Sequence, residues 1–315
     1  KMQAYCLFIV LVTIIPCFYC FPLFPYGTGN GDNSFTDCDD CCTDPISLNN
    51  FPYFGSTYSS FTVGSNGIII LDGCVTTFTP IAFPSSDTPL IAPYWGDVDL
   101  GAEGSTLFYS LQSGPSPIDS IAGFTSTEWI RATWETVGFY SADNSRQNTF
   151  QAIVATDGSS SYSCFVYPDD VESGNINGGL DWTTGDASEG SEGLGGTPAQ
   201  VGFDAGDSVN FFSLPDSQTD SIRAIDGVLG SPPANPASGV GTNEKGLFCY
   251  RIDQTTISCD PNLSPVGAIC PDNYVVDANT NCEGFLTTIA SATGCSSSVS
   301  HSPSISSPLS LGSNT

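Results

Sequence analysis

Three acidic residues that lie close together in the sequence, Asp97, Asp99 and Glu103, have the types and spacing of a cation site. Asp97 and Asp99 end an apolar stretch and are separated by one residue, so extended backbone points both side chains to one face, about 7 Å apart. Calcium binds carboxylates together with backbone oxygens, and Glu103 could add a ligand from the following loop. The sequence therefore predicts a weak calcium site; the alternative is a strand end with solvated acids and Trp95 in the core.

The cysteines predict a disulfide-bonded, secreted protein. Residues 7–15 form an apolar run that is too short to span a bilayer, which needs about 20 residues, and has the position of a signal-peptide core. Removing a signal peptide at residues 1–20 leaves ten of the 13 cysteines. In an oxidising compartment this even number predicts disulfides, whose pairing the sequence leaves open, and disulfides are favoured over a metal site at the Cys-x-x-Cys motif. The ten are Cys38, Cys41, Cys42, Cys74, Cys164, Cys249, Cys259, Cys270, Cys282 and Cys295.

The residue inventory argues against catalysis and against nucleic-acid binding. The only histidine, His301, lies in a Ser/Pro-rich stretch, so a serine or cysteine nucleophile has no histidine base. A pair of carboxylates could still serve a glycosidase, but among 33 acidic residues nothing singles out one pair. The net charge of −27 would repel a phosphate backbone. We therefore expect no enzyme, no nucleic-acid partner and no cofactor except calcium.

The pattern of short β-type runs between turn residues predicts an all-β fold, an antiparallel sandwich or barrel. Residues 61–63 and 67–71 flank a turn that contains Asn66-Gly67, and residues 149–155 and 161–167 flank Asp157-Gly158, so each pair predicts a hairpin. Residues 128–137 alternate between apolar and polar side chains, as in a half-buried strand. The best helix candidate, residues 117–124, is short.

The composition changes along the chain and predicts four zones. A signal peptide at residues 1–20 precedes a β domain at 21–253. Residues 254–295 carry four cysteines and too few apolar residues for a core, which predicts a disulfide-stapled segment. Residues 296–315 are rich in serine and proline and are expected to be a disordered tail. Asn262 lies in the only N-glycosylation sequon.

Six blocks of sequence, in order, resemble the NIDO domain, the extracellular module of nidogen, alpha-tectorin and membrane-mucin type proteins. They are Leu23-Phe-Pro-Tyr-Gly27, Pro52-Tyr-Phe-Gly55, Ile91-Ala-Pro-Tyr-Trp-Gly-Asp-Val-Asp99, Asn148-Thr-Phe-Gln-Ala152 running on to Ala155-Thr-Asp-Gly158, Ala199-Gln-Val-Gly-Phe203 and Arg251-Ile-Asp253. The resemblance covers about residues 23–253 and implies an extracellular role in cell–matrix adhesion or matrix assembly, without catalytic residues. The cysteines at 38, 41, 42, 74, 164 and 249 are additions to that pattern, and could cross-link the domain internally or to a partner.

These observations lead to one expected function and one alternative. We expect a secreted matrix or cell-surface protein that mediates cell–matrix adhesion through contacts with other extracellular proteins. The exposed loops at 172–198 and 230–245 are the expected contact surfaces. The cysteines could also link the chain into a disulfide-bonded oligomer. The alternative is a calcium-dependent carbohydrate-binding or mucus-type protein, in which aromatic side chains such as Tyr94, Trp95 or Trp182 would stack on sugars near the metal.

Overall fold

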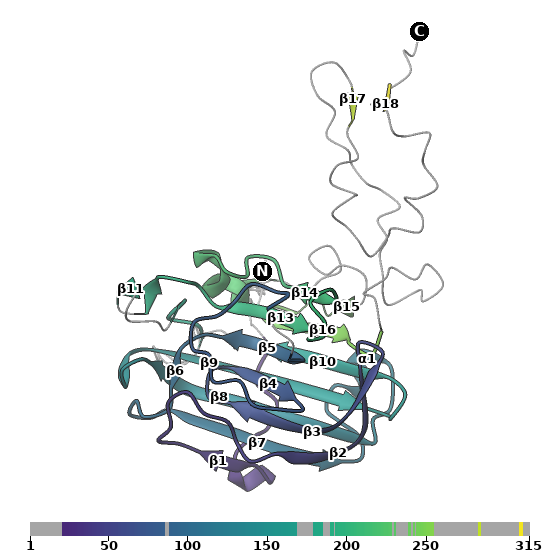
Figure 1. Cartoon of the computed structure of the whole chain (residues 1–315). Coiled ribbons are helices and arrows are strands. Elements are labelled where there is room, and N and C mark those ends of the chain that lie inside the picture. Colours follow the sequence, from purple (N-terminus) through teal and green to yellow (C-terminus); the bar gives the residue numbers. More distant parts are fainter. Residues whose placement is uncertain are drawn as a thin grey trace, which may run out of the picture.

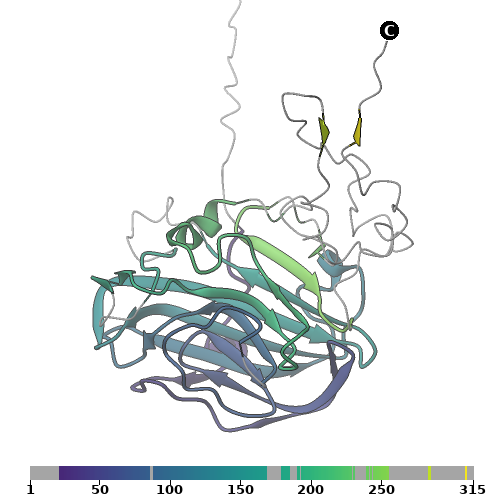
Figure 2. The same cartoon turned by 45° about the horizontal axis from the view of Figure 1, so that its top comes forward.

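Two antiparallel β-sheets stacked face to face form the body of the computed structural model (Figure 1; turned by 45° in Figure 2). The structure describes residues 21–85, 88–168, 179–184, 190–191, 193–228, 230, 239–240, 242, 244–254, 283–284 and 309–310. The predicted all-β class and the sandwich are confirmed. Within the described residues, no helix has the length and apolar character needed to cross a membrane.

The larger sheet has the strand order β1-β7-β8-β9-β10-β16-β15, with β6 also paired to β8. Its centre is built from the long strands β8 and β9, which the predicted hairpin then connects to β10 through Asp157-Gly158. The strands are β1 (Asn33–Phe35), β6 (Val98–Asp99), β7 (Thr106–Ser113), β8 (Glu128–Phe139), β9 (Asp143–Thr156), β10 (Ser161–Val166), β15 (Gly239–Val240) and β16 (Leu247–Arg251).

The smaller sheet has the order β14-β13-β5-β4-β3-β2. The second predicted hairpin joins β3 to β4, with Gly64 opposite Ile68. Its turn needs glycine at position 67, because φ there is +77° and a Cβ would lie 1.9 Å from the Tyr94 carbonyl oxygen. The strands are β2 (Ile46–Tyr53), β3 (Ser56–Gly64), β4 (Ile68–Leu71), β5 (Leu90–Trp95), β13 (Gln200–Asp204) and β14 (Phe211–Ser213).

The remaining elements are short. Two further two-stranded sheets pair β11 (Gly190–Ser191) with β12 (Leu194–Gly195) and β17 (Glu283–Gly284) with β18 (Leu309–Ser310). Two 3₁₀ helices, Thr28–Asn30 and Asp220–Gly227, and one α-helix, α1 (Asp119–Ala122), complete the described elements. The α-helix lies within the range 117–124 that the sequence predicts.

The main core lies between the two sheets and is rich in aromatic side chains. The alternation along β8 places Ile130, Ala132 and Trp134 in this core, as expected, where Trp134 stacks on Phe150 at a centroid distance of 4.9 Å. The smaller sheet is buried on its outer face too, because Ile68 and Ile70 of β4 lie under the connection from β4 to β5, together with Phe83 and Trp95. This second apolar layer explains why β4 consists of four consecutive apolar residues.

The outer face of the larger sheet is covered by the N-terminal strap, which we define as residues 21–32. Arg131 and Thr133 point to this face, and the sequence predicts that they are solvated, yet both are buried. Asp32 of the strap forms an ion pair with Arg131, at 2.5 Å between Nη2 and Oδ1. Gln151 of β9 accepts a hydrogen bond from the Phe24 N–H and donates one to the Phe24 carbonyl. The strap therefore makes β8 a fully buried strand.

Candidate functional site

The three predicted calcium ligands do not form one cluster in the structure. Asp97 lies just before β6 and is buried, whereas Glu103 is exposed. Asp99 ends β6, and both of its carboxylate oxygens accept backbone hydrogen bonds, from the N–H of Gly101 at 2.7 Å and that of Ala142 at 2.6 Å. The predicted set is therefore split between a buried carboxylate, a carboxylate that organises two loops, and a solvated one.

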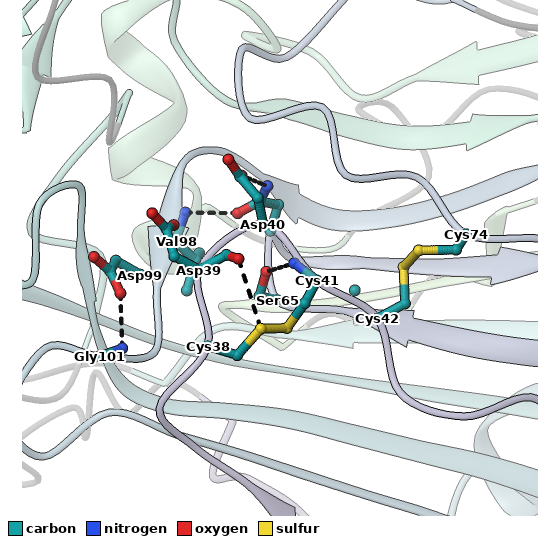
Figure 3. The surroundings of a disulfide bond; sticks show 12 residues. Cys38, Asp39, Asp40, Cys41, Cys42, Ser65, Cys74, Val98, Asp99 and Gly101 are labelled. Atoms are coloured by element: carbon teal, nitrogen blue, oxygen red, sulfur yellow. Dashed lines mark hydrogen bonds between the residues drawn. A yellow bond between two sulfur atoms is a disulfide. The ribbon is translucent and has the colours of Figure 1, made fainter.

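Asp97 lies instead beside the two acids of the disulfide loop, which we define as residues 37–41. Figure 3 shows this loop with Asp39 and Asp40. One carboxylate oxygen each from Asp39, Asp40 and Asp97 lies within 4.8 Å of the others. Asp40 accepts a hydrogen bond from Asn66 Nδ2 at 2.7 Å, and Asn66 Oδ1 accepts one from the Val98 N–H at 3.1 Å. A buried asparagine thus connects the loop to the start of β6.

The acidic surroundings have an electrostatic consequence for Asp39. Burial, and then the negative charges of Asp99 and Asp40, raise the pKa of Asp39 to about 6. The backbones of Asp39 and Asp99 pair in an isolated antiparallel β-bridge, which places the two residues opposite each other. No local pattern in the sequence indicates this cluster, because Asp39 and Asp97 are far apart in the chain. The only indication of the cluster in the sequence is the density of acidic residues around the Cys-x-x-Cys motif. The sequence does not place that motif beside β6.

Six of the ten cysteines form three disulfides in the described residues. Cys38 pairs with Cys41 inside the disulfide loop, and Cys42 pairs with Cys74, which follows β4 (Figure 3). Cys164 of β10 and Cys249 of β16 are register partners in neighbouring strands and form the third bond. The other four cysteines, at 259, 270, 282 and 295, lie outside the described residues, as does Asn262.

The aromatic residues proposed for sugar stacking are core residues. Tyr94, Trp95 and Trp182 are each at most 1% exposed. Tyr94 donates a hydrogen bond to the Trp182 carbonyl, and Trp182 Nε1 donates one to the Val137 carbonyl, so their polar atoms are also used within the protein. None of the three offers a face to a sugar.

Calcium binding through Asp97, Asp99 and Glu103 stays a prediction, and protein stability provides its test. Extracellular sites often have dissociation constants of about 10⁻⁴ to 10⁻³ M, so 2 mM calcium would stabilise the folded form by about 0.6–1.8 kcal/mol. The melting temperature is expected to rise by roughly 1–7 °C relative to excess chelator. Asp97→Asn should abolish the rise, whereas the matched variant Asp220→Asn should keep it. Identical melting curves with calcium and with chelator would contradict the prediction.

Comparison with known proteins places this sandwich in a family. The model of the nidogen-like domain (NIDO) matches residues 59–254, which include both sheets from β3 to β16. Alpha-tectorin of Gallus gallus is 33% identical over 80% of this chain, which covers 12% of that protein. Nidogen-2 of Mus musculus is 32% identical over 46% of the chain and 12% of its own length. Mucin-4 of Homo sapiens is 30% identical over 59% of the chain and 4% of its own length.

The chain thus spans 12% or less of the length of each of these three relatives. No solved structure matches it. The family match agrees with the resemblance that the ordered sequence blocks indicate, and it falls on the same sandwich. The chain belongs to the nidogen-like (NIDO) domain family.

Proposed function

We propose that this chain is a secreted protein of the extracellular matrix or cell surface that mediates cell–matrix adhesion through contacts with other proteins. The observation that carries the proposal is the match of the nidogen-like domain to residues 59–254, shared with alpha-tectorin, nidogen and mucin proteins. Family membership supports the β domain at 21–253 as the part that makes the contacts. Three disulfides in the described residues suit an oxidising, extracellular compartment.

The scaffold has the properties that adhesion by surface contact requires. Its aromatic side chains are packed between two sheets, and this leaves loops and sheet edges to bind partners. The edge strand β14 presents Phe211, which is 40% exposed, and the preceding turn presents Val209 at 71%. Large exposed apolar side chains are candidate contact points, and a specific interface would bury about 1,200–2,000 Å² in total. The loops at 172–198 and 230–245 stay proposed contact surfaces, although most of their residues lie outside the described ones.

The carbohydrate-binding alternative has lost the residues that supported it, because Tyr94, Trp95 and Trp182 are buried. Attachment of cells and of matrix proteins to surfaces coated with the secreted chain tests the adhesion proposal. A glycan array with and without chelator separates the two functions. Attachment without calcium-dependent glycan binding is the expected result; glycan binding without attachment would favour the alternative.

A further inference from the structure

The Cys38–Cys41 disulfide closes a much smaller ring than the other two. The paired cysteines are 3 residues apart, against 32 for Cys42–Cys74 and 85 for Cys164–Cys249. A disulfide stabilises a fold mainly by restricting the unfolded chain, and this restriction grows with ring size. The small ring therefore contributes least to holding the sandwich together.

The disulfide loop is also held at both ends without its disulfide. At the first end, the Asp37 N–H donates to the Leu100 carbonyl at 3.2 Å, and the Leu100 N–H donates to the Cys38 carbonyl at 2.9 Å. At the second end, Cys41 and Ser65 exchange two hydrogen bonds, from the Ser65 N–H to the Cys41 carbonyl at 2.8 Å and from the Cys41 N–H to Ser65 Oγ at 3.0 Å. Opening the bond would leave these anchors in place.

Solvent access differs between the disulfides as well. Cys164 and Cys249 are fully buried between strands, whereas Cys38, Cys41 and Cys42 are half-buried and Cys74 is exposed. Solvent access therefore disfavours only the Cys164–Cys249 bond. Cys42 packs against the apolar layer on the outer face of the smaller sheet, so breaking its bond would disturb that layer. An incoming thiolate must reach a sulfur atom along the S–S axis, which favours an exposed, locally held bond.

The charge around the loop selects which thiol can approach. Asp39 and Asp40 lie between the two cysteines in the sequence, and Figure 3 shows them in the loop together with Asp99, the bridge partner of Asp39. The Asp97 carboxylate lies beside those of Asp39 and Asp40. This local negative potential repels an anionic thiol and attracts a thiol in basic surroundings.

We propose that Cys38–Cys41 is a thiol-exchange site that forms a covalent bond to a partner protein whose free cysteine lies on a basic surface. The partner's thiolate attacks one of the two sulfur atoms, the Cys38–Cys41 bond breaks, and a mixed disulfide forms. The other cysteine leaves as a thiolate and takes a proton from water, so the step needs no external oxidant. The partner's role rests on the proposed adhesive function; the exchange chemistry is tested separately, with small thiols.

The experiment treats the secreted chain with cysteamine, 2-mercaptoethanol or 2-mercaptoethanesulfonate, which are cationic, neutral and anionic thiols. After acid quenching and alkylation, peptide mass spectrometry locates each adduct. Each rate is divided by the rate of that thiol with a small uncharged disulfide. We expect the first adducts at Cys38 or Cys41, and a normalised rate at least about fivefold higher for cysteamine than for the sulfonate.

Matched variants separate the effect of local charge from that of net charge. Asp39→Asn with Asp40→Asn should remove most of the preference for cysteamine, whereas Asp216→Asn with Asp220→Asn, with the same net charge, should keep it. Cys38→Ser with Cys41→Ser should keep the melting temperature within a few degrees and form no early adduct. First opening of Cys42–Cys74, simultaneous opening of all three bonds, or equal normalised rates for the cationic and anionic thiols would each overturn the proposal, whether or not the chain supports attachment.

Discussion

Replacing Arg131 by methionine is expected to lower the free energy of unfolding by about 3–5 kcal/mol, because it leaves the buried carboxylate of Asp32 without its partner. Arg131 Nε lies 2.9 Å from Asp32 Oδ1 and 3.0 Å from Oδ2, and the Nη2 group also donates to the Asn30 carbonyl. Asp32 in turn accepts hydrogen bonds from Ser110 Oγ and the Gly27 N–H. One arginine therefore fixes the strap to the centre of the larger sheet.

Chemical and thermal unfolding of the purified chain measure this loss. For a domain of this size the melting temperature should fall by roughly 6–20 °C. Arg223→Met is the matched control. The Arg223 guanidinium donates to the Asp181 carbonyl and is partly exposed, so this substitution should lower the free energy of unfolding by about 1 kcal/mol. Adding Asp32→Leu to Arg131→Met should restore part of the stability, since it removes the orphaned charge. A loss below about 1 kcal/mol for Arg131→Met would contradict the importance of the strap.

Replacing Trp182 by alanine is expected to cost about 3–5 kcal/mol, the range for deleting a large buried aromatic side chain. Trp182 is fully buried, with its ring 5.6 Å from that of Tyr94 and 6.3 Å from that of Phe139. Its Nε1 donates to the Val137 carbonyl at 3.0 Å, so the substitution also removes this buried hydrogen bond.

The control for this prediction is Trp129→Ala. Trp129 is half-buried on the outer face of β8, beneath the Arg131 guanidinium at 5.2 Å, so its loss should cost less. Unfolding curves and glycan binding are measured for both variants. If Trp182→Ala kept wild-type stability and lost only binding to a sugar, Trp182 would be a ligand-stacking residue and the core assignment would be wrong.

The parts of the fold that the sequence predicts are those encoded locally. The two hairpins follow from turn dipeptides beside apolar runs, and the inward face of β8 follows from its alternation. The sequence does not predict the strap, because its ion pair joins Asp32 and Arg131, which are 99 positions apart. No local pattern around either residue indicates its partner. The alternating pattern of β8 therefore predicts a solvated Arg131, whereas in the structure the strap covers this side chain.

The candidate site was predicted only in part, for a similar reason. Asp97 and Asp99 follow the apolar strand β5, but Asp99 belongs to β6 of the larger sheet. A two-residue period along one strand would assign the two residues the same environment. In the structure the Asp99 carboxylate accepts hydrogen bonds from the loop after β6 and from Ala142. The Asp97 carboxylate lies beside those of Asp39 and Asp40. Which acids meet depends on the path of the disulfide loop, and this path depends on contacts with Leu100 and Ser65 that no local pattern encodes.

The most direct measurement of the adhesion proposal is attachment to immobilised protein. Surfaces are coated with the purified chain and incubated with several cell types and with matrix extracts. We predict saturable attachment, well above that to an inert secreted protein of similar charge. The same chain after reduction and alkylation keeps its sequence and loses its disulfides, so it should lose attachment that depends on the folded sandwich. Attachment equal to that of the inert protein, in every cell type and extract, would contradict the proposed function.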